Sequence, residues 1–371
     1  MPSTAPIVVI KLGSNALADE QGHLDLLFLD AMAQQVRAAV DAGWWPVVVS
    51  SGAVASGMAS MGLTAKPSAL PDVQALAAIG QAGLAHRWQV ALAGHGLQGA
   101  QILLTGDDFQ ERQRYLNLAA TFRSLAAYGV IPIINENDTI SVAELTVGDN
   151  DRLSALVASQ LGAQRLLLLT DIDGVYASDP RHNPQAQRFE RLTRIDAALL
   201  ASMGNAGLRG RGGMRSKLEA ARLAMRAGVD TIIARAREES IVQRLLADEP
   251  HLGTRIPAQG RVVPSSRRRW LALARRPAGY IHIDAGAARA VRERGHSLLP
   301  AGITRVTGSF ARGDTVAIVD HDGTELARGL SALAAAELQQ ICGLRLEDAA
   351  TRLGYPIAKA AVHRDNMLVS T

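Results

Sequence analysis

The sequence predicts an α/β protein with a mainly parallel sheet covered by helices on both faces, followed by a small β-rich domain. Short runs that are apolar throughout, such as residues 6–12 and 165–169, alternate with segments of helical spacing. Strands buried on both faces of a parallel sheet have this composition. Beyond residue 277 the segments become short and alternating and are separated by glycines, which is typical of a small twisted sheet or barrel.

The predicted elements follow one another in a regular order. Residues 26–43 have helical spacing and stop at Gly43, and the turn Ser51-Gly52-Ala53 opens another helix. Further helices are expected at 110–127 and 151–161, and strands at 6–12, 46–50, 101–104, 130–134, 165–169 and 231–234. Ligands of parallel sheets bind beyond the carboxyl ends of the strands, so we expect the functional residues directly after each strand.

Composition divides the chain into three expected parts. Residues 257–276 are rich in arginine and proline. We therefore expect a first domain at 1–257, a linker with an amphipathic piece at 258–277, and a β-rich domain with a tail at 278–371. Residues 261–371 contain 16 basic and 10 acidic side chains, a surplus of six within a net charge of +4. This basic part admits a nucleic acid as a partner without requiring one.

The bulk composition is that of an ordinary globular protein. Hydrophobic residues make up 48% and charged residues 20% of the 371 residues. The apolar runs are too short to span a bilayer and no basic residue precedes the first of them, so we expect neither a membrane span nor a signal peptide. The single cysteine, Cys342, excludes an internal disulfide framework. These features favour a cytoplasmic enzyme.

Lysine is rare in this chain, which makes each lysine informative. Of 39 basic residues only four are lysines: Lys11, Lys66, Lys217 and Lys359. Where arginine supplies most positive charges, a remaining lysine is expected where a compact ammonium group is needed. Lys11 and Lys217 both lie near glycines, in loops that suit phosphate oxygens. Lys11 is equally compatible with a strand-end lysine before a turn.

Several nucleotide and metal motifs are absent from the sequence. It contains no G-x-x-x-x-G-K-[ST] loop, so it is not an ordinary P-loop nucleoside triphosphatase. His363-Arg364-Asp365 copies a protein-kinase triplet but lacks the accompanying motifs. The nine histidines are scattered, so no structural metal site is expected and no residue is assigned as a metal ligand.

Polar residues follow the predicted strands. Ser51 could bind a carboxylate or phosphate, or cap the next helix. Residues 135–138 (NEND) and 148–151 (GDND) are rich in acids and amides, which suit an ammonium group and Mg²⁺ but also loops and helix caps. Thr170-Asp171 follows the strand 165–169, and the glycine-rich segment 210–217 opens a helix, as phosphate sites do.

These residues suit one kind of phosphoryl transfer. A carboxylate nucleophile needs no general base, because the pKa of a glutamate side chain is about 4.3 and the group is ionised at neutral pH. Its attack on a γ-phosphate needs positioning, neutralisation of the charge on the transferred group and Mg²⁺. Two lysines from two glycine loops, with acids to orient them, meet that demand.

The motifs in this order resemble those of the amino-acid kinase family, in particular its glutamate kinases. They include VIKLGSN, SSGAVASG, VIPIINENDTI, VGDNDRLSALVA, LLLLTDIDGVYASDPR and GGMRSK. The segment SLLPAGITRVTGSFARGDTVAIVDHDGTELARGLS resembles a PUA domain. The resemblance covers essentially the whole chain and implies an amino-acid-kinase-like sandwich followed by a PUA-like domain.

The resemblance implies roles for individual residues. Lys11 and Lys217 would stabilise the transferred phosphoryl group, and Asp151 would hold both lysines. Glutamate would be bound by Ser51, Asp138 and Asn150, with Asn135 and Asp149 nearby. The nucleotide would be bound by Lys11, Thr170, Asp171, Arg211, Gly212, Gly213, Met214, Arg215, Ser216 and Lys217. Arg211 and Arg215 depart from the family's pattern, which has small polar residues at these places.

The resemblance also implies an activity and partners. ATP, with Mg²⁺, would phosphorylate the side-chain carboxylate of L-glutamate in the first step of proline biosynthesis, with proline as an inhibitor. A homo-oligomer (dimer or tetramer), contact with a glutamyl-phosphate reductase, and RNA binding by the PUA-like domain are further expectations, with no membrane partner.

Two alternatives stay open. One is another amino-acid kinase, such as an acetylglutamate kinase or an aspartokinase, against which the NENDTI and VGDND segments and the PUA-like tail argue. The other is an RNA-binding or RNA-modifying PUA protein, which the basic tail would favour and the parallel α/β pattern does not.

Overall fold

The computed structural model of the protein describes residues 5–19, 22–140, 149–178, 180, 183, 185–203, 213–259, 277–294, 296–356 and 360–369. The chain divides into two units, Met1–Val263 and Pro264–Thr371. Residues 260–276 lie outside the described ranges, and with them most of the predicted linker and its amphipathic piece. The predicted boundaries at 257 and 277 therefore stay predictions.

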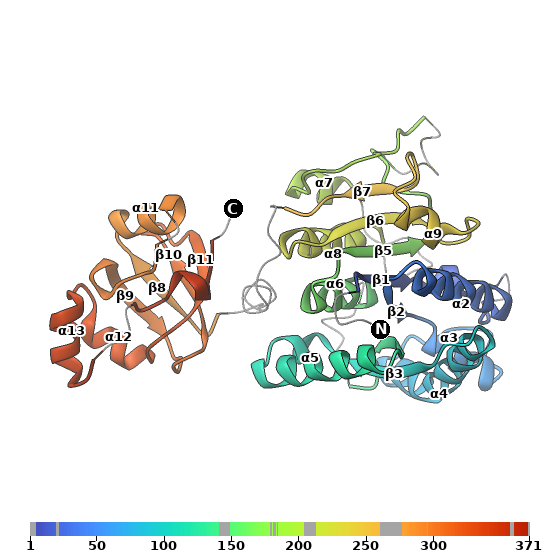
Figure 1. Ribbon diagram of the computed structural model, residues 1–371, viewed down its shortest axis with the longest axis horizontal. Helices are drawn as coiled ribbons and strands as arrows, with labels where there is room; N and C mark the ends of the chain where they lie inside the picture. Colours follow the sequence, from blue (N-terminus) through green and yellow to red (C-terminus); the bar gives the residue numbers. More distant parts are fainter. Residues whose placement is uncertain are drawn as a thin grey trace. The chain divides into compact units, whose positions relative to one another are not determined.

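The first unit is built on a seven-stranded sheet in the order β3-β4-β2-β1-β5-β6-β7 (Figure 1). The strands are β1 (Ile7–Leu12), β2 (Trp45–Ser50), β3 (Gly99–Leu104), β4 (Ile131–Glu136), β5 (Arg165–Thr170), β6 (Asp230–Arg235) and β7 (Thr254–Ile256). All neighbours pair in parallel except β6 and β7, which pair antiparallel. The predicted α/β class with a mainly parallel sheet is confirmed.

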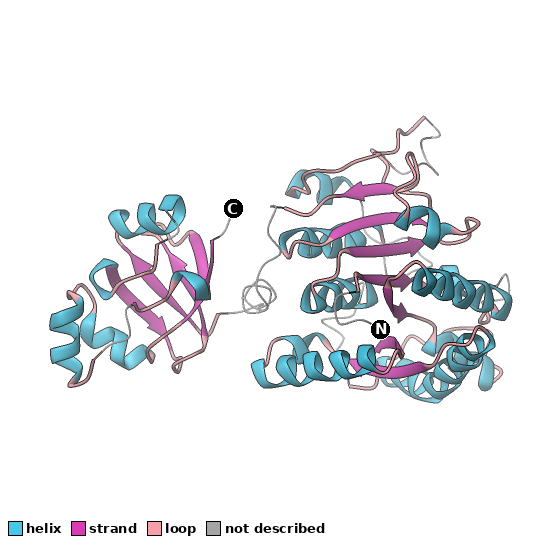
Figure 2. Ribbon diagram, in the orientation of Figure 1, coloured by secondary structure: helices cyan, strands magenta, loops and turns pink. Residues whose placement is uncertain are grey.

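Helices cover both faces of this sheet (Figures 1 and 2). They are α1 (Ser14–Leu17), α2 (Leu26–Asp41), α3 (Ala53–Ser60), α4 (Leu70–Gly94), α5 (Arg112–Ala127), α6 (Asp149–Leu161), α7 (Ala197–Ser202), α8 (Met214–Arg226) and α9 (Ile241–Leu246), with the 3-10 turn η1 (Gly106–Phe109). On one face α2 packs against α4 and α9, and on the other α6 packs against α5 and α8. Within the described ranges, none of the helices combines the length and the apolar character that a membrane crossing requires.

The alternation of side chains along β1 decides which residues can meet. Val8, Ile10 and Leu12 join the hydrophobic core that β1 shares with α2, α4 and α9. Successive side chains of a strand point to opposite faces, so Lys11 points to the other face. Helix α6 lies against β1 and against α8. The strand therefore directs its one lysine toward the layer that contains α6 and α8.

The second unit has its own sheet and its own core. Five strands lie in the order β12-β11-β10-β8-β9, with β8 parallel to β10 and the other pairs antiparallel. The elements are β8 (Gly279–Ile283), α11 (Ala285–Arg294), η3 (Pro300–Gly302), β9 (Ile303–Gly308), β10 (Thr315–Val319), β11 (Glu325–Leu330), α12 (Ala335–Ile341), α13 (Leu346–Leu353), η4 (Arg364–Asn366) and β12 (Met367–Val369). Ile281, Val316, Ile318 and Leu338 are fully buried in its core. The predicted small β-rich domain is confirmed.

Helices α3 and α4 approach each other closely at two glycines. A Cβ atom on Gly57 would lie 1.9 Å from the carbonyl oxygen of Leu76, and one on Gly80 would lie 2.0 Å from the carbonyl oxygen of Ala53. Helix α3 begins directly after Gly52, whose φ of +115° is readily adopted only by glycine. The glycine contact therefore holds in place the helix that leads away from the Ser51 turn.

We expect Gly57→Ala and Gly80→Ala to lower the free energy of unfolding of the first unit by about 1–3 kcal/mol or more, because the added methyl group must force the helices apart. Gly94→Ala is the matched control in α4, since a Cβ there meets no atom within 4 Å. Urea unfolding of the full chain, followed by tryptophan fluorescence, measures the difference. An unchanged midpoint in both Gly57→Ala and Gly80→Ala would contradict the close packing.

Candidate active site

Residues that the sequence predicts as functional gather at the carboxyl edge of the first sheet. Lys11 lies near the end of β1, Ser51 directly follows β2, Asn135 lies near the end of β4, and Thr170 ends β5. These four strands are neighbours in the sheet and run parallel, so their carboxyl ends meet at one edge. Parallel sheets bind their ligands at this edge.

A buried carboxylate joins two lysines here. Asp151 lies in the first turn of α6 and Lys217 in the first turn of α8. Oδ1 of Asp151 lies 2.5 Å from Nζ of Lys11, and Oδ2 lies 3.2 Å from Nζ of Lys217. The side chain of Asp151 is 1% exposed and each lysine side chain is 6% exposed. Three elements that are distant in the sequence thus converge on one carboxylate.

Burial and charge act in opposite directions on this cluster. Burial raises the pKa of Asp151, but the two ammonium groups outweigh it and hold that pKa well below its usual range. Burial lowers the pKa of Lys11, and the attraction of Asp151 offsets this only in part. With both lysines protonated, the three side chains carry two positive charges and one negative charge. The cluster therefore has a surplus positive charge that an anion would compensate.

A second carboxylate lies at the neighbouring strand end. Asp171 follows β5 and accepts a hydrogen bond from Oγ1 of Thr170 at 2.9 Å and one from Nδ2 of Asn15 at 3.5 Å. Burial raises the pKa of Asp171, but these hydrogen bonds and Lys217 lower it below its ordinary value. Asn15 lies in α1, two residues after Gly13 and within the VIKLGSN segment, so its place in that segment could have identified it.

Asn150, the residue before Asp151, organises a group of polar side chains. Its Nδ2 donates to Oγ of Ser51 and to Oδ1 of Asn135, both at 2.9 Å. Its Oδ1 accepts from the backbone N–H of Glu136 at 3.2 Å. Because Asn150 and Asp151 are consecutive, the helix backbone sets the separation between this polar group and the lysine cluster.

Two supports of the polar group were not predicted from the sequence. Oε1 of Gln81 accepts a hydrogen bond from Nδ2 of Asn135 at 2.8 Å. The ring N–H of Trp88 donates to Oγ of Ser50 at 2.8 Å, directly before Ser51. Gln81 and Trp88 both belong to α4, far from any strand end in the sequence. No local pattern could have assigned them to the site.

The structure describes the glycine-rich segment before α8 only in part. Arg211 and Gly212 lie outside the described residues, and Gly213 is the N-cap of α8 before Met214. Arg215 is exposed and pairs with Glu219 one turn along the helix, at 3.1 Å. The neighbouring residue, Ser216, is buried and donates to Oδ2 of Asp151 at 2.7 Å.

Two further predicted residues lie at the same edge of the sheet. Asp138 stands two positions beyond the end of β4, with a partly exposed side chain, and Asp149 is the first residue of α6. Of the residues between them, 141–148 lie outside the described ranges.

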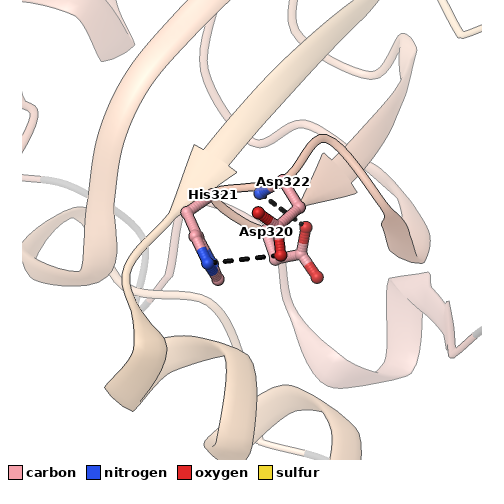
Figure 3. A group of neighbouring side chains, drawn as sticks. All are labelled: Asp320, His321 and Asp322. Atoms are coloured by element: carbon pink, nitrogen blue, oxygen red, sulfur yellow. Dashed lines mark hydrogen bonds and ion pairs between the residues drawn. The ribbon is translucent and has the colours of Figure 1, made fainter.

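A group in the second unit resembles a metal site by composition. Asp320, His321 and Asp322 lie together in the turn between β10 and β11 (Figure 3). Oδ1 of Asp320 accepts from the backbone N–H groups of Asp322 at 3.1 Å and Thr324 at 2.9 Å. The carboxylate of Asp320 therefore stabilises the turn, and this group supports no metal assignment.

Comparison with known proteins matches both units. Residues 6–235 match the Amino acid kinase family, and residues 279–351 match the PUA domain. Over 97% of its length the chain is 45% identical to the glutamate 5-kinase of Pseudomonas savastanoi pv. phaseolicola, 98% of which is covered. Over 98% of its length it is 44% identical to the glutamate 5-kinase of Halorhodospira halophila, 96% of which is covered.

A solved structure supports the fold. Carbamate kinase from Giardia lamblia, bound to AMP-PNP, has a TM-score of 0.51 and 19% identity, and the match covers 69% of this chain and 100% of that one. By its parallel sheet, its C-terminal β-rich unit and its similarity to relatives of the same length, the chain belongs to the amino-acid kinase family, among the glutamate 5-kinases with a C-terminal PUA domain.

Proposed function

We propose that the chain transfers the γ-phosphate of ATP to the side-chain carboxylate of L-glutamate, giving L-glutamyl 5-phosphate and ADP in the first step of proline biosynthesis. The observation that carries the proposal is the buried cluster of Lys11, Asp151 and Lys217 at the carboxyl edge of the sheet. The relatives that match over nearly the whole chain are glutamate 5-kinases.

The reaction balances without a general base. A carboxylate oxygen of glutamate forms a bond to the γ-phosphorus, and the bond from that phosphorus to the bridging oxygen breaks. The electron pair of the broken bond leaves with ADP. The attacking carboxylate is already ionised at neutral pH, so no proton has to be removed. What the protein must supply is position and charge.

Lys11 and Lys217 supply the charge. Their ammonium groups bind oxygens of the transferred phosphoryl group, and the surplus positive charge of the cluster favours that anion. Lys217 lies in the first turn of helix α8. The first backbone N–H groups of a helix have no partner within the helix. Met214 and the residues after it can therefore donate to nucleotide phosphates. Thr170 and Asp171 would line the same nucleotide site.

Asn150 and its neighbours supply the position of the acceptor. Ser51, Asn135 and Asn150 form a hydrogen-bonded group that suits the polar atoms of an amino acid. The carboxylate of Asp138, at the same edge, suits its α-ammonium group, and Asp149 stays a predicted neighbour of the glutamate site. Since Asn150 precedes Asp151, an acceptor bound to this group would lie directly beside the lysine cluster.

A magnesium ion that arrives with ATP would neutralise phosphate charge. Asp151 is an unsuitable ligand, because two lysines and Ser216 occupy its oxygens. The side chain of Asp171 is exposed, and its lowered pKa keeps it ionised at neutral pH. It therefore retains lone pairs for a metal that also keeps water and phosphate oxygens as ligands. The side chains at this edge thus fit the ion, with Asp171 as the residue that would hold it.

Proline as an inhibitor, a homo-oligomeric assembly, contact with a glutamyl-phosphate reductase, RNA binding by the second unit and a cytoplasmic location stay predictions. An electrophoretic mobility shift at low and high salt would test the RNA prediction, because phosphate contacts weaken as salt rises.

The activity is tested by trapping the acyl phosphate. Full-length protein is incubated with MgATP, hydroxylamine and one of three acids: L-glutamate, N-acetylglutamate or aspartate. We expect γ-glutamyl hydroxamate from glutamate and little product from the other two. Product from N-acetylglutamate or aspartate alone would assign the chain to a sister activity, and no product from any acid would contradict the proposed function.

Lys11→Ala and Lys217→Ala should each lower kcat by about 10²–10⁴-fold, as expected for the loss of a group that stabilises charge in the transition state. The KM for glutamate should change much less. Lys→Arg variants should recover little activity, because a planar guanidinium does not reproduce a compact ammonium group. Lys66→Ala, at an exposed lysine of the same unit, is the control. Full activity of Lys217→Arg would contradict the assignment.

As the pH rises, kcat/KM for ATP should begin to fall at a lower pH than it would if the pKa of Lys11 had the ordinary value of a lysine. This fall is the alkaline limb of the pH profile. Burial lowers the pKa of Lys11, so its ammonium group is lost as the pH rises through that lowered value. Asp151→Asn removes the carboxylate that raises the pKa of Lys11, so the limb should move to still lower pH. Asp72→Asn, at an exposed aspartate in the first turn of α4, is the control. A limb unaffected by Asp151→Asn would refute this coupling.

A further inference from the structure

The hydroxyl group of Ser216 lies between two acceptors. Its Oγ is 2.7 Å from Oδ2 of Asp151 and 2.8 Å from the carbonyl oxygen of Gly213. A serine in the first turn of a helix commonly bonds a backbone carbonyl three residues back, and such a bond alone would need no functional explanation. Ser216 differs from such a serine because its hydroxyl group also contacts the carboxylate of Asp151.

A single hydroxyl proton cannot satisfy both acceptors fully. The carbonyl oxygen of Gly213 can only accept, and so can Asp151, because the two lysines keep its carboxylate ionised. Hydrogen bonds to an ionised acceptor are roughly twice as strong as those between neutral groups. The proton of Ser216 therefore points to Asp151, and the hydroxyl has no second proton to offer a nucleotide.

The hydrogen bond from Ser216 also determines which oxygen of Asp151 faces each lysine. Oδ2 receives Ser216 and Lys217, while Oδ1 faces Lys11. Without the hydroxyl, the carboxylate can rotate toward either ammonium group, and the two lysines lose their common orientation. Ser216 is 9% exposed, so water does not readily replace the missing donor.

We propose that Ser216 is a positioning residue for phosphoryl transfer, which orients the carboxylate of Asp151 between Lys11 and Lys217 and does not bind the nucleotide through its side chain. The inference rests on the proposed function and refines the sequence prediction that groups Ser216 with the nucleotide ligands. Its contribution is made to the transition state, where both ammonium groups must meet the transferred phosphoryl group at once.

The test compares variants of the full-length protein in the hydroxamate assay. Ser216→Ala should lower kcat by about tenfold or more, the loss expected for a hydrogen bond to a charged group, while the KM values for ATP and glutamate stay within about twofold. Ser216→Thr retains the hydroxyl and should restore most of the turnover. Ser202→Ala is the matched control, because Ser202 also bonds the carbonyl three residues back, that of Leu199, in α7.

The pH profile separates positioning from a general structural role. The charged groups acting on Lys11 are Asp151 from α6, Lys217 from α8 and Asp171 after β5. A misoriented Asp151 stabilises the Lys11 ammonium less, so the alkaline limb of Ser216→Ala should move to lower pH, and that of Ser216→Thr should not. Thermal unfolding midpoints verify that each variant is folded. If Ser216→Ala does not fold, Ser216→Cys, which substitutes a weak donor, should have reduced kcat at unchanged KM.

Two results would overturn the inference. A wild-type kcat and pH profile in folded Ser216→Ala, or in Ser216→Cys, would mean that the hydroxyl group does not orient Asp151. A higher KM for ATP at unchanged kcat would make the hydroxyl a nucleotide ligand. Failure of the proposed function would be recognised separately, since the wild-type protein would then form no hydroxamate from glutamate.

Discussion

The rest of the site depends on one interaction, the double ion pair of the Asp151 carboxylate with Lys11 and Lys217. A buried ammonium group is stable only when an opposite charge compensates for the water it has lost, and the effective penalty is about several kcal/mol per ion. Asp151 compensates two such groups with one charge. The remaining positive charge is left for a ligand, and a transferred phosphoryl group supplies the complementary charge. Incomplete compensation in the free protein is thus what prepares the site for its substrate.

The fold makes this arrangement possible. The pleat of β1 turns Lys11 away from the hydrophobic core that Val8, Ile10 and Leu12 join, and toward the layer of α6 and α8. The first turns of these two helices contribute Asp151 and Lys217 at the same edge. On the opposite face, glycines let α3 and α4 approach closely. Through Gln81 and Trp88, α4 supports Asn135 near the end of β4 and Ser50 at the end of β2. Both helical layers therefore contribute to one edge of the sheet.

Much of the fold was predictable from the sequence because the strands are short and apolar throughout. Helix α4 was not predicted as an element; it contains Gly80, Gly83 and Gly94, which lower helix propensity, and its contact with α3 is a tertiary feature. Lys11 and Lys217 could be selected because lysine is rare in the chain. Asp151 could not be selected by pattern alone, since acids and amides after a strand are equally common in loops and caps; its role came from the resemblance. Ser216 was predicted beside the nucleotide, and only its distance to Asp151 indicates a different partner.

The central claim is that Lys11 and Lys217 share the buried carboxylate of Asp151. An NMR titration of the lysine side chains tests it most directly, because the chain has only four lysines. Lysine labelled with ¹³C and ¹⁵N would give few side-chain signals, and the exposed Lys66 serves as the internal reference. In the free protein, Lys11 should titrate at a lower pH than an exposed lysine ordinarily does. Binding of MgADP with a phosphate analogue should raise the pKa of Lys11, and Asp151→Asn should lower it. If Lys11 titrates at the pH of an ordinary exposed lysine and responds neither to the nucleotide nor to Asp151→Asn, the shared buried carboxylate is not the basis of the site.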